Sequence, residues 1–126
     1  MKPLILAGAI LLSLFTAGLM NCRTINTISR SMDKQISLSQ DAAQQGRWKS
    51  ADQALARALD TWESHNVYLH VTLDHNDIDK ADLLLSALQQ YAAQRDGAHY
   101  CADARRLRTQ LDHLAETQRL SLQNIL

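Results

Sequence analysis

Residues 3–22 read PLILAGAILLSLFTAGLMNC, and this uncharged, apolar stretch determines how the rest of the chain can be placed. A helix through it would be about 30 Å long at about 1.5 Å per residue, which is close to the hydrocarbon thickness of a bilayer. The domain that follows is too small to surround such a helix on every side. The stretch therefore predicts a transmembrane or signal helix at residues 1–22, followed by one domain at residues 23–126.

Three interpretations fit this stretch. The favoured one is a signal anchor, a single uncleaved membrane helix that tethers the domain. The second is a cleaved signal peptide, for which Thr16-Ala17-Gly18 offers small residues near a cleavage site. The third is a lipoprotein signal that ends at Cys22, although Asn21 stands where such sites have Gly, Ala or Ser. Under the second interpretation the domain would be secreted, and under the third it would be anchored by a lipid, instead of being tethered by a transmembrane helix.

The basic residues on the two sides of the stretch give a weak orientation signal. Lys2 precedes the stretch, whereas Arg23, Arg30 and Lys34 follow it. This distribution points slightly against export of the domain. The short flank before the stretch favours the opposite, and we expect the domain to lie outside the cytoplasm.

The composition excludes several classes of function. The chain has 13 basic and 13 acidic residues, so it lacks the basic excess of nucleic-acid-binding proteins. Cys22 and Cys101 lie in different regions, which leaves no disulfide framework and no CxxC site. No nucleophile with its base, phosphate loop or pair of catalytic glutamates can be recognised. We therefore expect a protein that is not an enzyme and that carries no cofactor.

Helix-favouring residues dominate the domain, and few positions interrupt them. Gly46, Gly97 and the polar residues 74–77 divide it into four helical segments. The expected segments are 23–45 (continuous with the apolar stretch), 47–73, a third that begins near Asn76, and 98–116. The alternating apolar residues of the tail at 120–126 predict that it docks on these helices.

One face of the second segment is apolar, because Trp48, Leu55, Trp62 and Leu69 recur every seven residues. A shift of 52 residues places Trp48 on Tyr100 and Leu55 on Leu107, although two unrelated amphipathic helices would align about as well. The predicted fold is all-α. It is an antiparallel helical bundle or two helical hairpins of the tetratricopeptide type, preceded by the N-terminal helix.

The densest polar cluster surrounds His75. His75 and Asp79 are four residues apart and share a helix face, and His113 sits in a second Leu-Asp-His segment. If the second and fourth segments lie side by side, His75 and His113 approach each other and form a metal-binding or pH-sensitive element. The commoner interpretation is a helix start capped by Asp74 or Asn76.

Aromatic and basic residues are the candidates for partner binding. The aromatic anchors and the basic face are Trp48, Trp62, Tyr91, Arg105, Arg106 and Arg108. The three arginines suit an acidic partner or lipid headgroups, or they pair with Asp79 and Asp82 of the third segment. A solvated face is the commonest meaning of such a run.

Several motifs resemble those of one bacterial family. They are Gly46-Arg47-Trp48, the DHxxID pattern at residues 74–79 and the LxLxNIL pattern at residues 120–126. Together they resemble the domain of unknown function numbered four-three-six-three, from which this chain departs in being rich in alanine and glutamine and poor in lysine. The resemblance implies a membrane-anchored helical domain outside the cytoplasm with an accessory role. It marks His75, Asp79, His113 and Asn124 as positions to test.

The sequence thus predicts a non-enzymatic, membrane-tethered interaction or accessory domain. Its expected partners are the membrane and a membrane protein, with a homo-oligomer left open and no nucleic acid. The alternative is an extracytoplasmic sensor or metal-binding domain centred on His75, Asp79 and His113.

Overall fold

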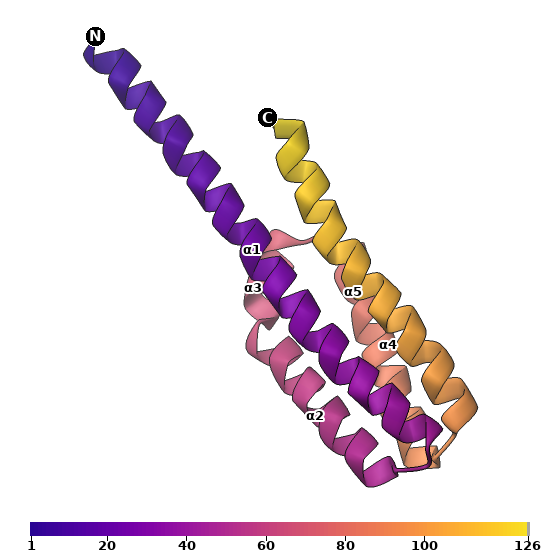
Figure 1. The fold of residues 1–126 in the computed structure, drawn as a ribbon. Coiled ribbons are helices and arrows are strands. Elements are labelled where there is room, and N and C mark those ends of the chain that lie inside the picture. The colour runs from indigo at the N-terminus through magenta and orange to yellow at the C-terminus, as the bar shows by residue number, and fades with distance from the viewer. Residues whose placement is uncertain (126) are drawn as a thin grey trace.

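The computed structural model describes residues 1–125, and five helices account for nearly all of them (Figure 1). The helices are α1 (Lys2–Gln44), α2 (Trp48–Ser64), α3 (Asn66–Thr72), α4 (His75–Gln94) and α5 (Gly97–Ile125). No strand occurs within residues 1–125. The prediction of an all-α fold is therefore confirmed.

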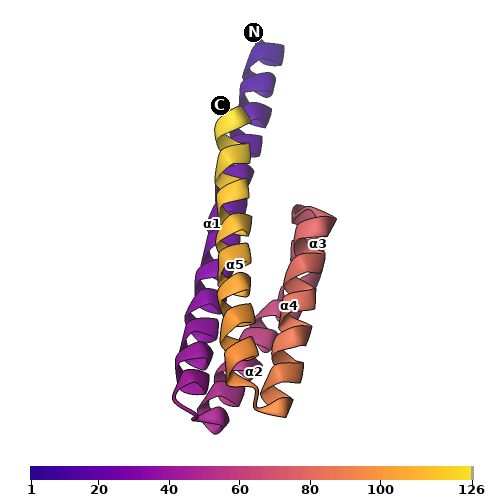
Figure 2. The same ribbon diagram turned by 90° about the vertical axis from the view of Figure 1, so that its right-hand side faces the viewer.

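Two antiparallel hairpins make up the bundle. α1 and α2 form the first hairpin, α4 and α5 form the second, and the short α3 joins them (Figure 1). The hairpins pack mainly through α1 against α5, while α2 and α4 touch over a much smaller area. Figure 2 shows α5 between α1 and α4. The bundle is thus closed along α1 and α5 and more open along α2 and α4.

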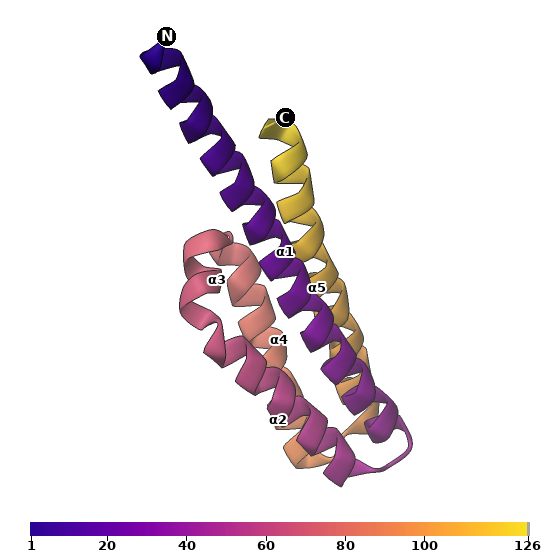
Figure 3. The same ribbon diagram turned by 60° about the vertical axis from the view of Figure 1, so that its left-hand side comes forward.

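The two halves of α1 have opposite environments. Over 18 residues of its apolar half the mean hydropathy is 2.1 and no residue is buried, so α1 is long and apolar enough to cross a membrane. In its other half Ile25, Met32 and Ile36 are almost completely buried. The predicted continuity between the apolar stretch and the segment 23–45 is confirmed. Figure 3 shows the two chain ends projecting from the same end of the bundle.

Both tight turns lie at the opposite end of the bundle. Gly46 has a φ of +75°, a left-handed conformation that glycine adopts without a steric penalty. Arg95 closes α4 with a φ of 54°. The backbone N–H of His99 donates to the carboxylate of Asp96 at 3.2 Å, and this bond lowers the pKa of Asp96. Asp96 therefore stabilises the start of α5 in its ionised form.

The expected helix at 47–73 is wrong in one respect, because it breaks at His65 into α2 and α3. The side chains at the break compete for backbone groups. The hydroxyl of Ser64 donates to the carbonyl of Thr61 at 3.0 Å, and the Nδ1 atom of His65 lies 2.8 Å from the same carbonyl. Such local bonds offer the chain an alternative to helix continuation.

The expected short tail is instead a continuation of α5. Residues 117–125 stay helical, because no glycine or proline interrupts the helix after Gly97. Leu120 is 53% exposed. The side chains of Leu122 and Ile125, and all of Leu126, lie outside what the structure describes, so docking of the tail stays a prediction.

The cap at the start of α4 agrees with the prediction. The carboxylate of Asp74 accepts a hydrogen bond from the backbone N–H of Asn76 at 3.3 Å. Asp77 lies in the first turn, where the helix dipole favours a negative charge.

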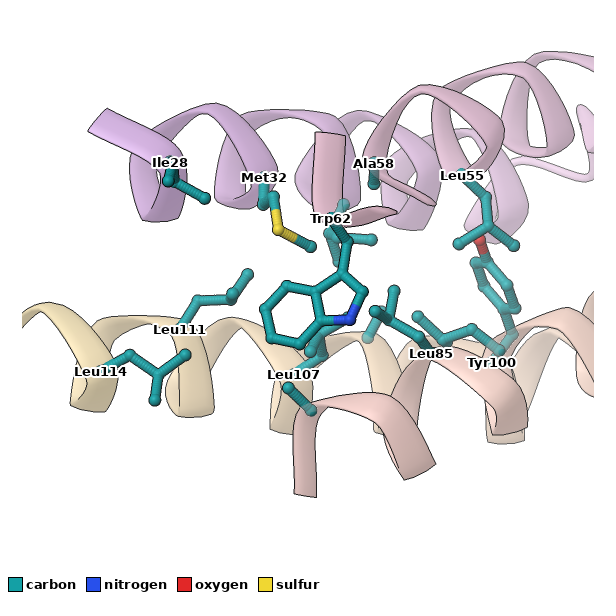
Figure 4. Close-up of a cluster of buried hydrophobic side chains, with 14 of the residues drawn as sticks. Ile28, Met32, Leu55, Ala58, Trp62, Leu85, Tyr100, Leu107, Leu111 and Leu114 are labelled. Atoms are coloured by element: carbon teal, nitrogen blue, oxygen red, sulfur yellow. The ribbon is translucent and has the colours of Figure 1, made fainter. Parts of the chain in front are cut away.

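Trp62 occupies the centre of the hydrophobic core. Figure 4 shows its indole between Met32 of α1 and Leu107 of α5, with Leu85 of α4 beside it. A single side chain of α2 therefore touches the interface at which the two hairpins meet.

A buried hydrogen-bonded triad lies nearer the turns. The hydroxyl of Ser39 donates to the carbonyl of Ala51 at 2.7 Å and is bonded to the hydroxyl of Tyr100. Burial raises the pKa of Tyr100, so its hydroxyl stays protonated and acts as the donor to Ser39. Trp48 packs edge-on against the same tyrosine, with ring centroids 5.5 Å apart. The triad ties α1, α2 and α5 together.

Removing the hydroxyl of Ser39 should destabilise the protein more than removing the hydroxyl of Tyr100. Ser39→Ala leaves the buried Tyr100 hydroxyl unpaired and should lower the free energy of unfolding by about 1–3 kcal/mol. Tyr100→Phe leaves Ser39 bonded to Ala51 and should cost less, about 0.5–1.5 kcal/mol. Urea unfolding of the detergent-solubilised protein, followed by circular dichroism, measures both. A larger loss for Tyr100→Phe than for Ser39→Ala would contradict this description of the triad.

Candidate functional site

Asn21 joins three helices at the end of the apolar stretch. Its side-chain amide donates to Oε1 of Gln118 in α5 at 3.1 Å, and the hydroxyl of Tyr68 in α3 donates to its carbonyl oxygen. Both α3 and α5 therefore meet α1 at the level where its uncharged run ends. From this junction α5 continues toward the same end of the molecule as the apolar part of α1, and the two helices diverge there (Figure 1).

A groove rich in arginine runs between α1 and α5. We call it the α1–α5 groove, with a volume of about 440 Å³; the charged side chains that line it are Arg30, Arg105, Arg108, Arg119, Asp33 and Asp112. The Nε atom of Arg108 donates to the carboxylate of Asp33 at 2.9 Å, which pairs one arginine of α5 with α1. With this pair set aside, positively charged side chains still outnumber negatively charged ones in the lining of the groove.

The predicted basic face is therefore divided between two surfaces. Arg105 and Arg108 line the α1–α5 groove, whereas Arg106 forms an ion pair of 2.7 Å with Asp103 on its own helix. The alternative that these arginines pair with Asp79 and Asp82 does not hold for Arg106 and Arg108. Arg108 reaches Asp33 because α5 packs along α1, and the carboxylate of Asp82 instead accepts a hydrogen bond from Trp62.

A second groove follows the open side of the bundle between α2 and α4. Two adjoining hollows of about 370 and 290 Å³ share Leu59 and Gln89, and together we call them the α2–α4 groove. Trp62 lies in its floor, with Nε1 donating to the carboxylate of Asp82 at 2.6 Å. An ion pair of 2.9 Å between Arg95 and Asp52 closes the end nearest the turns.

The three predicted aromatic anchors are all engaged within the chain. Trp62 is only 4% exposed. Trp48 is half-buried against Tyr100, and the guanidinium of Arg95 lies 5.5 Å from the centre of its ring. Tyr91 is half-buried and stacks on His99 at 5.2 Å. Trp62 offers a partner the floor of a groove, not a projecting side chain.

The histidines form pairs other than the one expected. Nε2 of His113 lies 3.6 Å from the carboxylate of Asp77, and the ring of His75 packs edge-on against His70 at 5.8 Å. α5 packs on α4 and brings His113 to Asp77 in the first turn of α4, while the ring of His75 packs on His70 instead. Asp79 is exposed and belongs to neither pair.

The described residues contain no group of three or more histidine, cysteine, aspartate or glutamate side chains placed to hold a metal ion. The hypothesis of a metal site at His75, Asp79 and His113 therefore has no supporting geometry. Asn124, the other position marked by the family resemblance, is exposed near the end of α5.

Cys101 is a free, partly buried cysteine of α5. Its thiol lies 3.7 Å from the carbonyl of Gln40. Burial raises the pKa of this thiol, which favours the protonated, unreactive form.

Comparison with known proteins gives one match. The family described as a domain of unknown function, DUF4363, matches residues 19–125. The chain belongs to this family. No curated protein and no solved structure matches the chain. The DUF4363 match contains the Asn21 junction, both grooves and the histidine pairs, and it leaves most of the apolar stretch outside.

Asn21, Tyr68 and Gln118 form the Asn21 junction, and none of them was predicted to do so. Arg30 and Arg119 of the α1–α5 groove were not predicted as site residues either. The sequence does carry a signal for the level of the junction. Arg23 follows one uncharged run and Arg119 precedes another, and in antiparallel helices two such changes can lie at the same level.

The paired arrangement of the histidines predicts weak binding of transition metals. Calorimetric titration of the detergent-solubilised chain with Zn²⁺ at neutral pH should show no site tighter than about 10 µM, because a structural zinc site needs four converging ligands. Tight binding of one ion per chain, abolished by His75→Ala and retained in His99→Ala, would contradict this expectation and support the sensor alternative.

Proposed function

We propose that this member of the DUF4363 family is a non-enzymatic, membrane-tethered domain that holds a partner protein beside the bilayer. The observation that carries this proposal is the continuity of α1. The same helix supplies the exposed apolar stretch and, without a break, one wall of the hydrophobic core.

A continuous helix fixes the bundle relative to its anchor. Between Gly18 and Gly46 the sequence has no glycine or proline that would act as a hinge. If residues 3–22 span the bilayer, the bundle stands on the membrane with the Asn21 junction at its surface. The turns at the far end then lie about 35 Å away, from the 23 residue steps between Asn21 and Gln44 at about 1.5 Å each.

The α2–α4 groove is the proposed binding surface for the partner. It follows the side of the bundle that α1 and α5 leave open. Because α2 and α4 lie along the same bundle as α1, a partner helix that leaves the membrane beside α1 would meet the groove lengthwise, and helix-in-groove binding is a common mode of recognition. The proposed partner is therefore a membrane protein, and a second copy of the chain is the competing occupant.

The proposed location is outside the cytoplasm, which can be tested together with the anchor. In intact cells, Lys49→Cys in a Cys22→Ala, Cys101→Ala background should react with a membrane-impermeant maleimide, since residue 49 is exposed at the far end of the bundle. The protein should stay in the membrane pellet after carbonate extraction and keep its apolar stretch, as seen by mass spectrometry of its N-terminal peptides.

Labelling only after cell lysis would contradict the orientation. Recovery of an unprocessed protein in the soluble fraction without detergent would contradict the tether. Loss of the apolar stretch from the mature protein would instead support one of the two processed forms.

The partner groove predicts a position-dependent crosslink. A photoreactive amino acid at Gln89, which both hollows of the α2–α4 groove share, should give a discrete adduct with a membrane protein. The same group at Lys80, exposed on α4 and outside the groove, is the matched control and should give none. Equal adducts at the two positions would contradict the groove as the binding surface, and an adduct of twice the chain mass would indicate self-association.

A further inference from the structure

We propose that the α1–α5 groove, together with the hollow that continues it along the apolar stretch, binds one anionic phospholipid at the bilayer surface. Its phosphate lies where the two meet, between Arg23 and Arg119, and its acyl chain follows Thr16, Leu19 and Met20. This inference rests on the proposed tether and extends it by assigning a lipid site to the surface of the bundle that the partner groove does not use.

The shape of the groove matches an amphiphile. A second hollow of about 400 Å³, which Thr16, Leu19 and Arg23 help to line, shares Asn26 and Arg119 with the α1–α5 groove. The two hollows are therefore continuous along α1 and α5. One end lies within the apolar stretch, and the other end lies among arginines. A ligand that fills both has an apolar part and an anionic part in that order.

The charges favour a phosphate. Arg108 is engaged with Asp33, whereas Arg30, Arg105 and Arg119 make no ion pair with another of the described residues. The carboxylate of Asp112 also lines the groove and opposes an anion, but the arginines outnumber the acidic groups. Guanidinium groups bind phosphate oxygens through paired hydrogen bonds, which suits them to a lipid headgroup.

The Asn21 junction sets the depth of Arg23 and Arg119 in the bilayer. The bond between Asn21 and Gln118 places these residues at one level. Arg23 and Arg119 lie within about 3 Å of that level along their helix axes, at about 1.5 Å per residue. Beyond them both helices are uncharged, over residues 3–22 of α1 and residues 120–125 of α5. Arginines at the end of an apolar segment extend toward the headgroups, which is where a lipid phosphate lies.

The same placement favours a lipid over an acidic protein. The apolar end of the groove includes Leu19 and Met20, which belong to the proposed membrane-spanning stretch. Lipid already surrounds those residues in a bilayer, whereas an acidic protein segment would have to leave water to reach them.

Native mass spectrometry of the full-length protein tests this proposal. The protein is reconstituted in vesicles of phosphatidylcholine, or of phosphatidylcholine and phosphatidylglycerol in equal amounts, and released in a mild detergent. One phosphatidylglycerol per chain should be retained in preference to phosphatidylcholine. Arg23→Gln and Arg119→Gln should each lower retention by about fivefold, since each removes one arginine at a lipid surface.

Arg106→Gln is the matched control and should retain the lipid, because Arg106 pairs with Asp103 outside the groove. Arg23 and Arg119 are exposed, and circular dichroism should show both variants folded. The comparison of lipids on the unmutated chain does not depend on any variant. Inorganic phosphate in excess should not displace the lipid, because it cannot use the apolar end of the groove.

Four results would each overturn the lipid site and leave the tether standing. Two concern retention: the two lipids are retained equally, or Arg119→Gln retains as much lipid as the unmutated chain. The other two are that inorganic phosphate displaces the lipid, or that an acidic protein occupies the groove. A protein that does not sediment with the vesicles would overturn the tether and the lipid site together.

Discussion

The continuity of α1 through Asn21 is the constraint on which the rest of the structure depends. Before Asn21 the helix is apolar and exposed, and after it the same helix contributes Ile25, Met32 and Ile36 to the core. Hydrogen bonds from Tyr68 and to Gln118 fix α3 and α5 at the level of this change. The environment of the first half of α1 therefore determines how the whole bundle is held.

Packing two hairpins through α1 and α5 gives the bundle two unlike sides. The closed side brings arginines of α5 against α1 and leaves a positively charged groove, with Arg108 paired to Asp33. The open side leaves α2 and α4 far enough apart for a groove whose floor is Trp62. A lipid on the first side and a protein on the second would not compete for the same surface.

Local features of the sequence were sufficient to predict most of the secondary structure. The all-α fold, the turn at Gly46 and the Asp74 cap each depend on residues close together in the chain. Gly97 was expected to interrupt the helices, but Arg95 takes the left-handed conformation and Gly97 begins α5. The break at His65 was missed because it depends on side chains that compete for the carbonyl of Thr61, within a segment whose apolar period continues. The continuation of α5 to Ile125 was missed because alternation of apolar residues is a weaker constraint than an uninterrupted run of helix-favouring residues.

The pairing of helices could not be predicted from one sequence. Seven-residue spacing identifies the apolar face of a helix but does not identify the helix it packs against. This is why pairing of Arg108 with Asp79 or Asp82 stayed an open alternative, whereas Arg108 lies against Asp33, and why the contact of His113 with Asp77 was not foreseen. The grooves follow from the pairing, so the sequence pointed to Arg105, Arg108 and Trp62 but not to the surfaces that they line.

The most direct test of the central claim is the depth of α1 in a bilayer. Nitroxide labels are placed singly at the exposed positions Leu12 and Leu38 of the protein in vesicles, in a chain without native cysteines. Power saturation then compares access of oxygen, which concentrates in lipid, with access of a water-soluble nickel chelate. The account predicts that oxygen dominates at Leu12 and the chelate at Leu38. Equal access of the chelate to both positions would contradict it.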